Sequence, residues 1–222
     1  MNQINSPVES MVQIDMAGLG VTQVYKLLIG SIVPRPIALT STIDSNGITN
    51  LAPFSFFSGV SSDPPCVMLA ITRKPDGGKK DTLRNIEANR EFVVNTVAHW
   101  MAGPMNQCSA EYPPGESEFE KVGLTPLPSV KVRPPRVKES PIHMECELFK
   151  MVEIGDGRVG SSVIVVGRIL MMHVHAAAYE NGKIKLDAID PVSRLSGISY
   201  GRTSGVYEIP RARTDQRGDF GV

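Results

Sequence analysis

PRPIALTSTIDSNGITNLAPFSFF, residues 34–57, is the stretch that decides the fold of this chain. Pro34 and Pro36 force extended backbone. Residues 37–43 then alternate between two sets of side chains, which is typical of a half-buried strand. Asn46-Gly47 is a strong signal for a hairpin turn. The chain is therefore predicted to fold back through residues 48–52 as a second antiparallel strand.

The same kind of pattern recurs along the rest of the chain. Further strands are predicted over residues 67–72, 92–97, 145–154 and 162–175, where apolar and β-branched residues dominate. Within 145–154 the glutamates share one parity, so we expect a charged face opposite an apolar one. Several strands joined by short turns, without regular βαβ alternation, predict a mainly β antiparallel barrel.

Helices are predicted to be few and peripheral. Residues 22–29 are expected to form a short helix that ends at Gly30. A second helix is predicted from Asp81, as its N-cap, to about Asn89, with Leu83 and Ile86 facing inward. Residues 99–108 and 116–121 are expected to add helical turns. The Pro-rich segment 126–141 is predicted to be an extended connection and a candidate arm across a dimer interface.

Bulk composition excludes several classes of protein. The chain has 222 residues, 41% hydrophobic, with a formal net charge of zero, which argues against a nucleic-acid binder. Residues 1–15 lack the basic start and apolar segment of a signal peptide. The most apolar stretch, 163–174, is too short to span a bilayer as a helix. The three cysteines form no CxxC motif, so a soluble cytoplasmic protein without a membrane partner is expected.

Familiar catalytic and metal-binding motifs fail on their context. Residues 155–160 (GDGRVG) match G-x-G-x-x-G, but strand sequence follows where a helix is needed, so a hairpin turn is predicted there. His173 and His175 share one face of a strand, yet no third ligand can be assigned, and no metal site is predicted. There is no Gly-x-Ser-x-Gly elbow and no cysteine with a motif-level histidine partner, so a hydrolase is not predicted.

Two regions remain as candidate ligand sites. Hydroxyls at residues 40–42 and the polar interruptions Asn50, Pro53 and Ser55 could meet the ring atoms of a planar heteroaromatic ligand, or could belong to an ordinary hairpin with a distorted edge. The run Lys79-Lys80-Asp81-Thr82 precedes the predicted second helix. It could hold a phosphate at the helix N-terminus, or be a solvated basic pair.

The residues in these regions resemble a known family. PRPIALTST, the hairpin turn, NLAPFSFF, KDTLRNI and FVVN are similar, in this order, to the flavin reductase-like family with the FMN-binding split barrel, which includes flavoredoxin-type proteins. HMECEL and VVGRILMMHV add weaker similarity, and the resemblance covers about residues 22–200. It implies one domain over residues 1–222, built on a six-stranded antiparallel Greek-key split barrel. It also implies a homodimer with one FMN per subunit near the interface.

The resemblance also implies a set of site residues and an activity. The positions expected to line the flavin ring and ribityl chain are Ser41, Thr42, Asn50, Ala52, Pro53 and Ser55, and those expected at the phosphate are Lys80 and Thr82. The implied function is an FMN-binding oxidoreductase with NADH or NADPH as electron donor, either a flavin reductase or a flavoredoxin-like electron-transfer protein. Because the cofactor carries the hydride chemistry, no catalytic side chain is assigned.

Two alternatives stay open from the sequence. One is a flavin-binding carrier or redox sensor without turnover, and the other is a pyridoxamine-phosphate-oxidase-like enzyme on a related barrel. The resemblance does not extend residue by residue into the tail after Tyr200.

Overall fold

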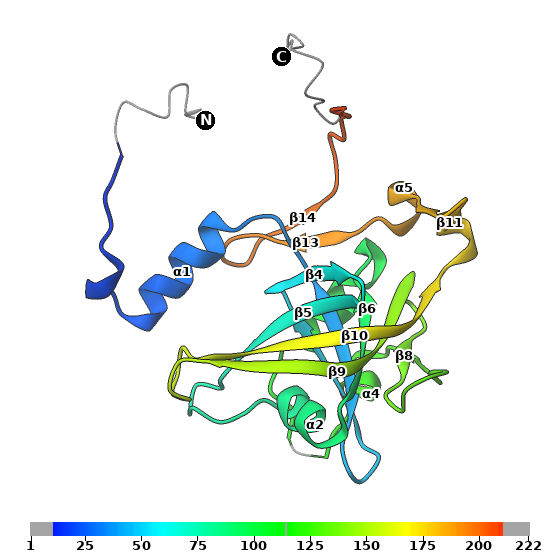
Figure 1. Ribbon diagram of the computed structural model, residues 1–222, viewed down its shortest axis with the longest axis horizontal. Coiled ribbons are helices and arrows are strands. Elements are labelled where there is room, and N and C mark those ends of the chain that lie inside the picture. The colour runs from blue at the N-terminus through cyan, green and yellow to red at the C-terminus, as the bar shows by residue number, and fades with distance from the viewer. Residues whose placement is uncertain (1–10, 114, 211–222) are drawn as a thin grey trace.

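A curled antiparallel sheet forms the body of the protein. The computed structural model describes residues 11–113 and 115–210 (Figure 1). Seven strands pair in the order β3-β2-β6-β9-β10-β5-β4. They are β2 (Ala38–Ile43), β3 (Thr49–Phe54), β4 (Phe57–Ser62), β5 (Pro65–Thr72), β6 (Glu91–Thr96), β9 (Ile142–Ile154) and β10 (Ser162–Val174). The edge strands β3 and β4 are joined only by Ser55 and Phe56, so the two edges meet at this junction and the barrel stays open elsewhere. The predicted mainly β split barrel is confirmed, but its sheet has seven strands where six were expected, and β4 is a strand that the sequence pattern did not predict.

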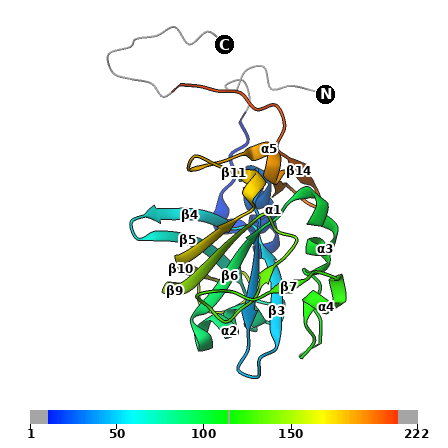
Figure 2. The same cartoon turned by 90° about the vertical axis from the view of Figure 1, so that its right-hand side faces the viewer.

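Smaller elements surround this barrel. The helices are α1 (Val21–Ser31), α2 (Asp81–Asn89), α3 (Ala102–Gln107), α4 (Glu118–Val122) and α5 (Leu186–Ile189), with 3₁₀ turns at Met16–Gly18, His99–Met101 and Ala176–Ala178. β1 (Arg35–Pro36) pairs with β13 (Val192–Arg194), which pairs with β14 (Tyr200–Arg202). Two hairpins pair β7 (Pro126–Leu127) with β8 (Arg136–Val137), and β11 (Tyr179–Glu180) with β12 (Lys183–Ile184). Helix α2 lies across one end of the barrel, and α3 and α4 lie along the flank beside β3 (Figures 1 and 2).

Strand β2 is buried on both faces. Ala38 belongs to the core inside the barrel, together with Phe92 and residues of β5, β9 and β10. Leu39, the next residue, belongs to a second core between the barrel and α3–α4, which includes Phe119. The half-buried strand expected for residues 37–43 is therefore wrong, because helices cover the face that a free hairpin would expose to water. The hydroxyl residues 40–42 have no solvent exposure at all.

Both turns predicted from glycine-containing dipeptides are confirmed. The β2–β3 hairpin turns at Asn46-Gly47, where Gly47 has a φ of +88° and the Asp44 carboxylate accepts the backbone N–H of Ile48 at 2.8 Å. Such a positive φ favours glycine. Residues 155–160 connect the antiparallel strands β9 and β10. The G-x-G-x-x-G match is therefore a hairpin turn, and no helix follows it.

Three local expectations need correction. The N-cap of α2 is Lys80, and Asp81 is the first helical residue, whose carboxylate pairs with Arg84 and Lys74. Helix α1 continues to Ser31, one residue beyond the predicted stop. Glu145, expected on a charged outer face of its strand, has zero solvent exposure. It is buried because the segment after β7 folds over that face of β9.

The Pro-rich segment 126–141 lies on its own barrel. The backbone N–H groups of Val130 and Lys131 donate to the Glu145 carboxylate on β9, at 2.9 and 2.6 Å. The segment also contributes the β7–β8 hairpin, outside the main sheet. As predicted, it is not a strand of the main sheet, but it folds back as a hairpin where an extended connection was expected, and these contacts are within one chain.

Membrane-spanning helices and disulfides are both absent from the described part of the chain. None of its helices is long and apolar enough to cross a bilayer. The three cysteines are all buried and unpaired.

Candidate functional site

A small pocket forms where the open edge of β3 meets the N-terminus of α2. Its volume is about 100 Å³. Five residues predicted as ligand contacts line it: Asn50, Ala52, Pro53, Lys80 and Thr82. The remaining wall comes from Lys74, Asp81, residues 108–112 and Glu118. Residues about thirty positions apart in sequence therefore converge because α2 follows β5 and lies beside the start of β3.

Lys80 is one of two lysines that line this pocket, beside the acidic residues Asp81, Glu111 and Glu118. Lys80 is the N-cap of α2, and no described side chain caps the helix, so its first N–H groups remain available. The ammonium lies 5.9 Å from the centroid of the Phe54 ring. Burial lowers the pKa of Lys80, and the carboxylate of Glu111 partly opposes that shift. The neighbouring Lys79 instead points to Glu87, with its ammonium 2.7 Å from that carboxylate. Of these two neighbours, Lys80 is the one directed at the pocket.

A network of amides and hydroxyls fixes the floor of the pocket. The side-chain amide of Asn50 donates to the hydroxyl oxygens of Thr82 at 3.0 Å and Thr42 at 3.2 Å. The amide of Asn85 on α2 donates to the same Thr42 oxygen at 3.0 Å. Each threonine thus accepts a hydrogen bond and keeps its own O–H as a donor. The network explains why polar residues can be buried here without loss of their hydrogen bonds.

The β3 edge beside the pocket already has one side-chain partner, Glu118. The Leu51 N–H donates to the buried Glu118 carboxylate at 2.8 Å, so N–H groups of this parity point away from β2. Pro53 has the same parity, and an edge position tolerates its missing N–H. Burial raises the pKa of Glu118, with the hydrogen bond from Leu51 acting against it. Burial also raises the pKa of Cys108, which lines the same pocket, to about 12, so its thiol stays protonated and is no nucleophile.

The structure does not bring all predicted residues to this pocket. Ser41 and Thr42 are adjacent on β2, so their side chains leave opposite faces. Thr42 lies beneath Asn50, whereas the buried Ser41 hydroxyl donates to the Pro135 carbonyl of the Pro-rich segment. Ser55 lies beyond the pocket at the β3–β4 junction, where its hydroxyl accepts from Arg35 Nε at 3.3 Å.

Sequence reasoning missed two groups at this site. Glu118 and the segment 108–112 approach from α3 and α4, and no motif marks them. Arg35 lies inside the quoted block, and its charge between two prolines in an otherwise apolar run is a signal that could have been used. The residue as a whole is 4% exposed.

A larger cavity lies elsewhere. It has a volume of about 640 Å³ and lies between α1 and the β9–β10 turn, with Tyr25, Leu28, Phe56 and Val159 among its mostly apolar lining residues. None of the residues predicted as ligand contacts lines it. Its size alone does not make it the site, because none of the described residues that line it has a charged side chain that could pair with a phosphate.

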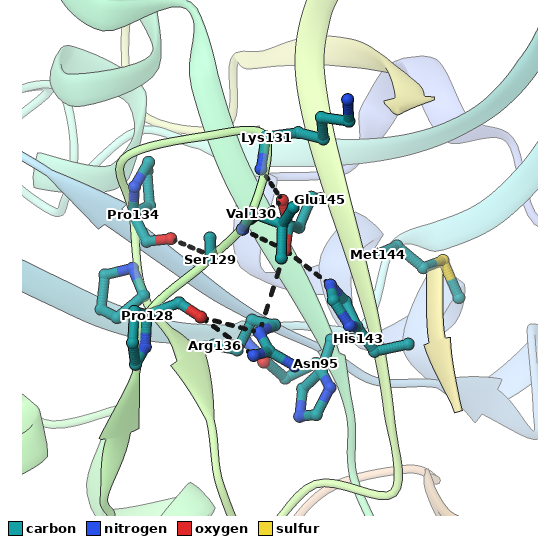
Figure 3. Close-up of polar contacts among 12 residues, drawn as sticks. Asn95, Pro128, Ser129, Val130, Lys131, Pro134, Arg136, His143, Met144 and Glu145 are labelled. Carbon is teal, nitrogen blue, oxygen red and sulfur yellow. Dashed lines mark hydrogen bonds and ion pairs between the residues drawn. The ribbon is translucent and has the colours of Figure 1, made fainter. Parts of the chain in front are cut away.

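Two of the four histidines, His143 and His173, take part in a polar cluster around the buried Glu145. Figure 3 shows the Glu145 carboxylate facing the backbone of the Pro-rich segment. His173 Nε2 contacts the same carboxylate at 2.6 Å, and His143 Nε2 contacts the Val137 carbonyl at 2.7 Å. Among residues 11–113 and 115–210, no group of three or more side chains converges as a metal site. His173 therefore takes part in holding the Pro-rich segment.

Comparisons with known proteins agree with this geometry. The flavin reductase like domain family matches residues 29–188. The solved structure of nitrilotriacetate monooxygenase component B from Bacillus cereus is 35% identical, with a TM-score of 0.87 over 90% of this chain and 100% of that chain. The 2-nitrobenzoate 2-nitroreductase of Pseudomonas fluorescens is 32% identical, with a TM-score of 0.83 over 94% and 100%. A structure from Shewanella frigidimarina described as having a split barrel domain is 27% identical, with a TM-score of 0.77 over 88% and 96%.

The fold and these similarities define the class of this protein as a split-barrel, flavin-dependent oxidoreductase. The chain belongs to the flavin reductase-like domain family.

Proposed function

We propose that the protein binds FMN along the open edge of β3 and uses NADH or NADPH to reduce it. The observation that carries the proposal is the convergence of Lys80, Thr82 and Asn50 at the N-terminus of α2. Free helix amides, the positive end of the helix dipole and an ammonium that forms no salt bridge with the described residues together suit a phosphate dianion.

The size of the pocket supports seating the phosphate end of the cofactor. At about 100 Å³ it is smaller than the roughly 300–1,000 Å³ typical of whole small-molecule sites. A phosphate fits this space, and the remainder of the nucleotide would extend along β3 past Ala52 and Pro53 toward Ser55. Ala52 and Pro53 line the pocket themselves, so this edge of β3 leads from the proposed phosphate site directly toward Ser55.

The residues of the chain then have separate roles. Lys80 and Thr82 would bind the phosphate, and Asn50 would hold the Thr82 hydroxyl in position for it. The open edge at Pro53 and Ser55 would face the ring system. When bound, FMN supplies the hydride acceptance from the nicotinamide and the later release of electrons. The Cys108 thiol, which lines the same pocket, stays protonated, so no covalent step on it is proposed.

We further propose that the protein is a homodimer. The β3–β4 split leaves edges that a second subunit could cover. Large apolar side chains are also exposed, including Tyr25 on α1 and Phe149 on β9, at 50% and 55%. Sedimentation of the FMN-loaded protein at micromolar concentration tests this: a single monomeric species would contradict it.

Absorption spectroscopy tests the proposed function. The purified or reconstituted protein should carry about one FMN per chain, and stopped-flow mixing with NADH or NADPH should bleach the oxidised flavin band. Folded apoprotein that binds no FMN in calorimetry would refute the site. FMN binding without bleaching by either donor would instead indicate a carrier or redox sensor.

A further inference from the structure

Arg35 is a buried cation whose hydrogen bonds to the described residues all end on neutral oxygen atoms. Its Nη1 donates to the carbonyls of Ile29 at 2.8 Å and Ile32 at 2.5 Å, at the C-terminal end of α1. Its Nη2 donates to the Leu195 carbonyl at 3.0 Å, and its Nε to the Ser55 hydroxyl at 3.3 Å. The residue is 4% exposed. The carbonyl end of a helix carries only a partial negative charge, so the guanidinium remains a net positive charge in the protein interior.

A buried charge without a full counter-charge destabilises the folded protein. If this position only had to connect α1 to its neighbours, neutral hydrogen-bond donors would serve. The position of Arg35 suggests why a charge is retained. It lies directly behind the β3–β4 junction, over the Phe56 ring at 6.0 Å from its centroid. The junction follows Phe54, whose ring centroid lies 5.9 Å from the Lys80 ammonium, so it is the next stretch of the β3 edge after the proposed phosphate site.

The contact with Arg35 also fixes what Ser55 can do. A serine hydroxyl has one proton to donate and lone pairs to accept with. Because Arg35 Nε–H occupies a lone pair, the Ser55 proton is left to donate to a neighbouring acceptor. A hydrogen bond donated by a cation polarises the hydroxyl that accepts it, so the O–H of that hydroxyl becomes a stronger donor. Ser55 is thereby prepared as a donor at the place where the ring end of the nucleotide would lie.

We propose that Arg35 is a positioning residue that acts through Ser55 to stabilise the reduced, negatively charged form of the bound flavin. The proposal rests on the FMN site proposed above. A fixed positive charge in a low-dielectric interior favours negative charge that develops nearby, and the oriented hydroxyl relays this preference. Arg35 thus raises the reduction potential of the flavin without contacting it.

A purely structural clamp predicts a different result. Arg35 ties α1 to the segment after β13, so its loss would lower the melting temperature whether or not flavin is bound. A clamp that has no electrostatic role would leave the reduction potential of bound flavin unchanged. The potential therefore separates the two roles.

Spectroelectrochemical titration of the FMN-loaded protein provides the test. We expect Ser55→Ala and Arg35→Met each to shift the equilibrium toward oxidised flavin by about tenfold or more. The double variant should shift the oxidation equilibrium no further than Arg35→Met alone, because Arg35 acts on the flavin through Ser55. Arg35→Lys, which keeps the charge, should recover part of the shift. Ser193→Ala, which removes a half-buried hydroxyl bonded to the Gly201 carbonyl, is the matched control and should match wild type.

The outcomes are distinct. If Ser55→Ala binds FMN with a wild-type potential, or if the two single effects add fully, the inference is overturned. Should Arg35→Met fail to fold, Ser55→Ala and Arg35→Lys still decide. If wild type binds no FMN, the proposed function fails and this inference fails with it. If FMN binds and is reduced but no variant changes the potential, only this inference fails.

Discussion

Replacement of Lys80 by alanine is the sharpest test of the phosphate site. The ammonium lines the pocket at the start of α2, beside free helix amides. A hydrogen bond to a charged group contributes about 1.5–3 kcal/mol, and each 1.4 kcal/mol is about tenfold in affinity. Lys80→Ala should therefore weaken FMN binding by roughly ten- to a hundredfold. Calorimetric titration of apoprotein with FMN measures the change.

Riboflavin and Lys79→Ala are the controls. Riboflavin lacks the phosphate, so wild type and Lys80→Ala should bind it about equally. Lys79 is paired with Glu87, so Lys79→Ala should leave FMN affinity within a few-fold of wild type. Burial lowers the pKa of Lys80, which means that folding disfavours its charged form. The apoprotein of Lys80→Ala should accordingly melt no lower than wild type. Equal loss of FMN and riboflavin, or no loss of either, would refute the phosphate assignment.

Three further predictions follow from the fold and the site. Because the β3–α2 pocket has room for one phosphate group, FAD should bind more weakly than FMN in calorimetry; equal affinity would argue against it. Gly167→Ala on β10 should destabilise the protein by about 1–3 kcal/mol in urea unfolding, because the new Cβ would lie 2.8 Å from Phe92 Cε1. The control is Gly59→Ala on β4, whose new Cβ meets no atom within 4 Å, so its stability should stay near that of wild type. Glu145→Gln should flatten the loss of stability in acid, measured by urea unfolding between pH 7 and 3; a wild-type pH profile in the variant would contradict this.

The pH dependence at Glu145 follows from its surroundings. Burial raises its pKa, but hydrogen bonds from the Val130 and Lys131 amides and from His173 outweigh it, and the pKa of folded Glu145 lies below its usual value. A carboxylate with a lowered folded pKa contributes stability that is fully present above its unfolded pKa, about 4.3. This stability is lost as the pH falls through the lower folded pKa. Glutamine does not titrate, so its variant should lose less stability over that range.

Much of the barrel was predictable from local sequence. Alternating apolar residues, the Asn46-Gly47 and residue 155–160 turns, and the inward positions of Leu83 and Ile86 all rest on contacts between near neighbours. β4 escaped prediction because residues 57–62 are mostly exposed and carry little apolar pattern. Glu145 was placed on the wrong side because only a distant Pro-rich segment covers it.

The sequence by itself determined the class of fold, the family and the region of the ligand site, because hairpin strands, turns and a helix start are encoded by residues close together in the chain. The tertiary structure decided which side chains meet. It directed Lys80 rather than Lys79 at the pocket, placed Ser41 on the opposite face of β2, and joined Arg35 to a carbonyl 160 residues away. Such contacts depend on how strands and helices pack against one another. That packing arises from the burial of apolar surface over the whole domain, and no short stretch of sequence records it.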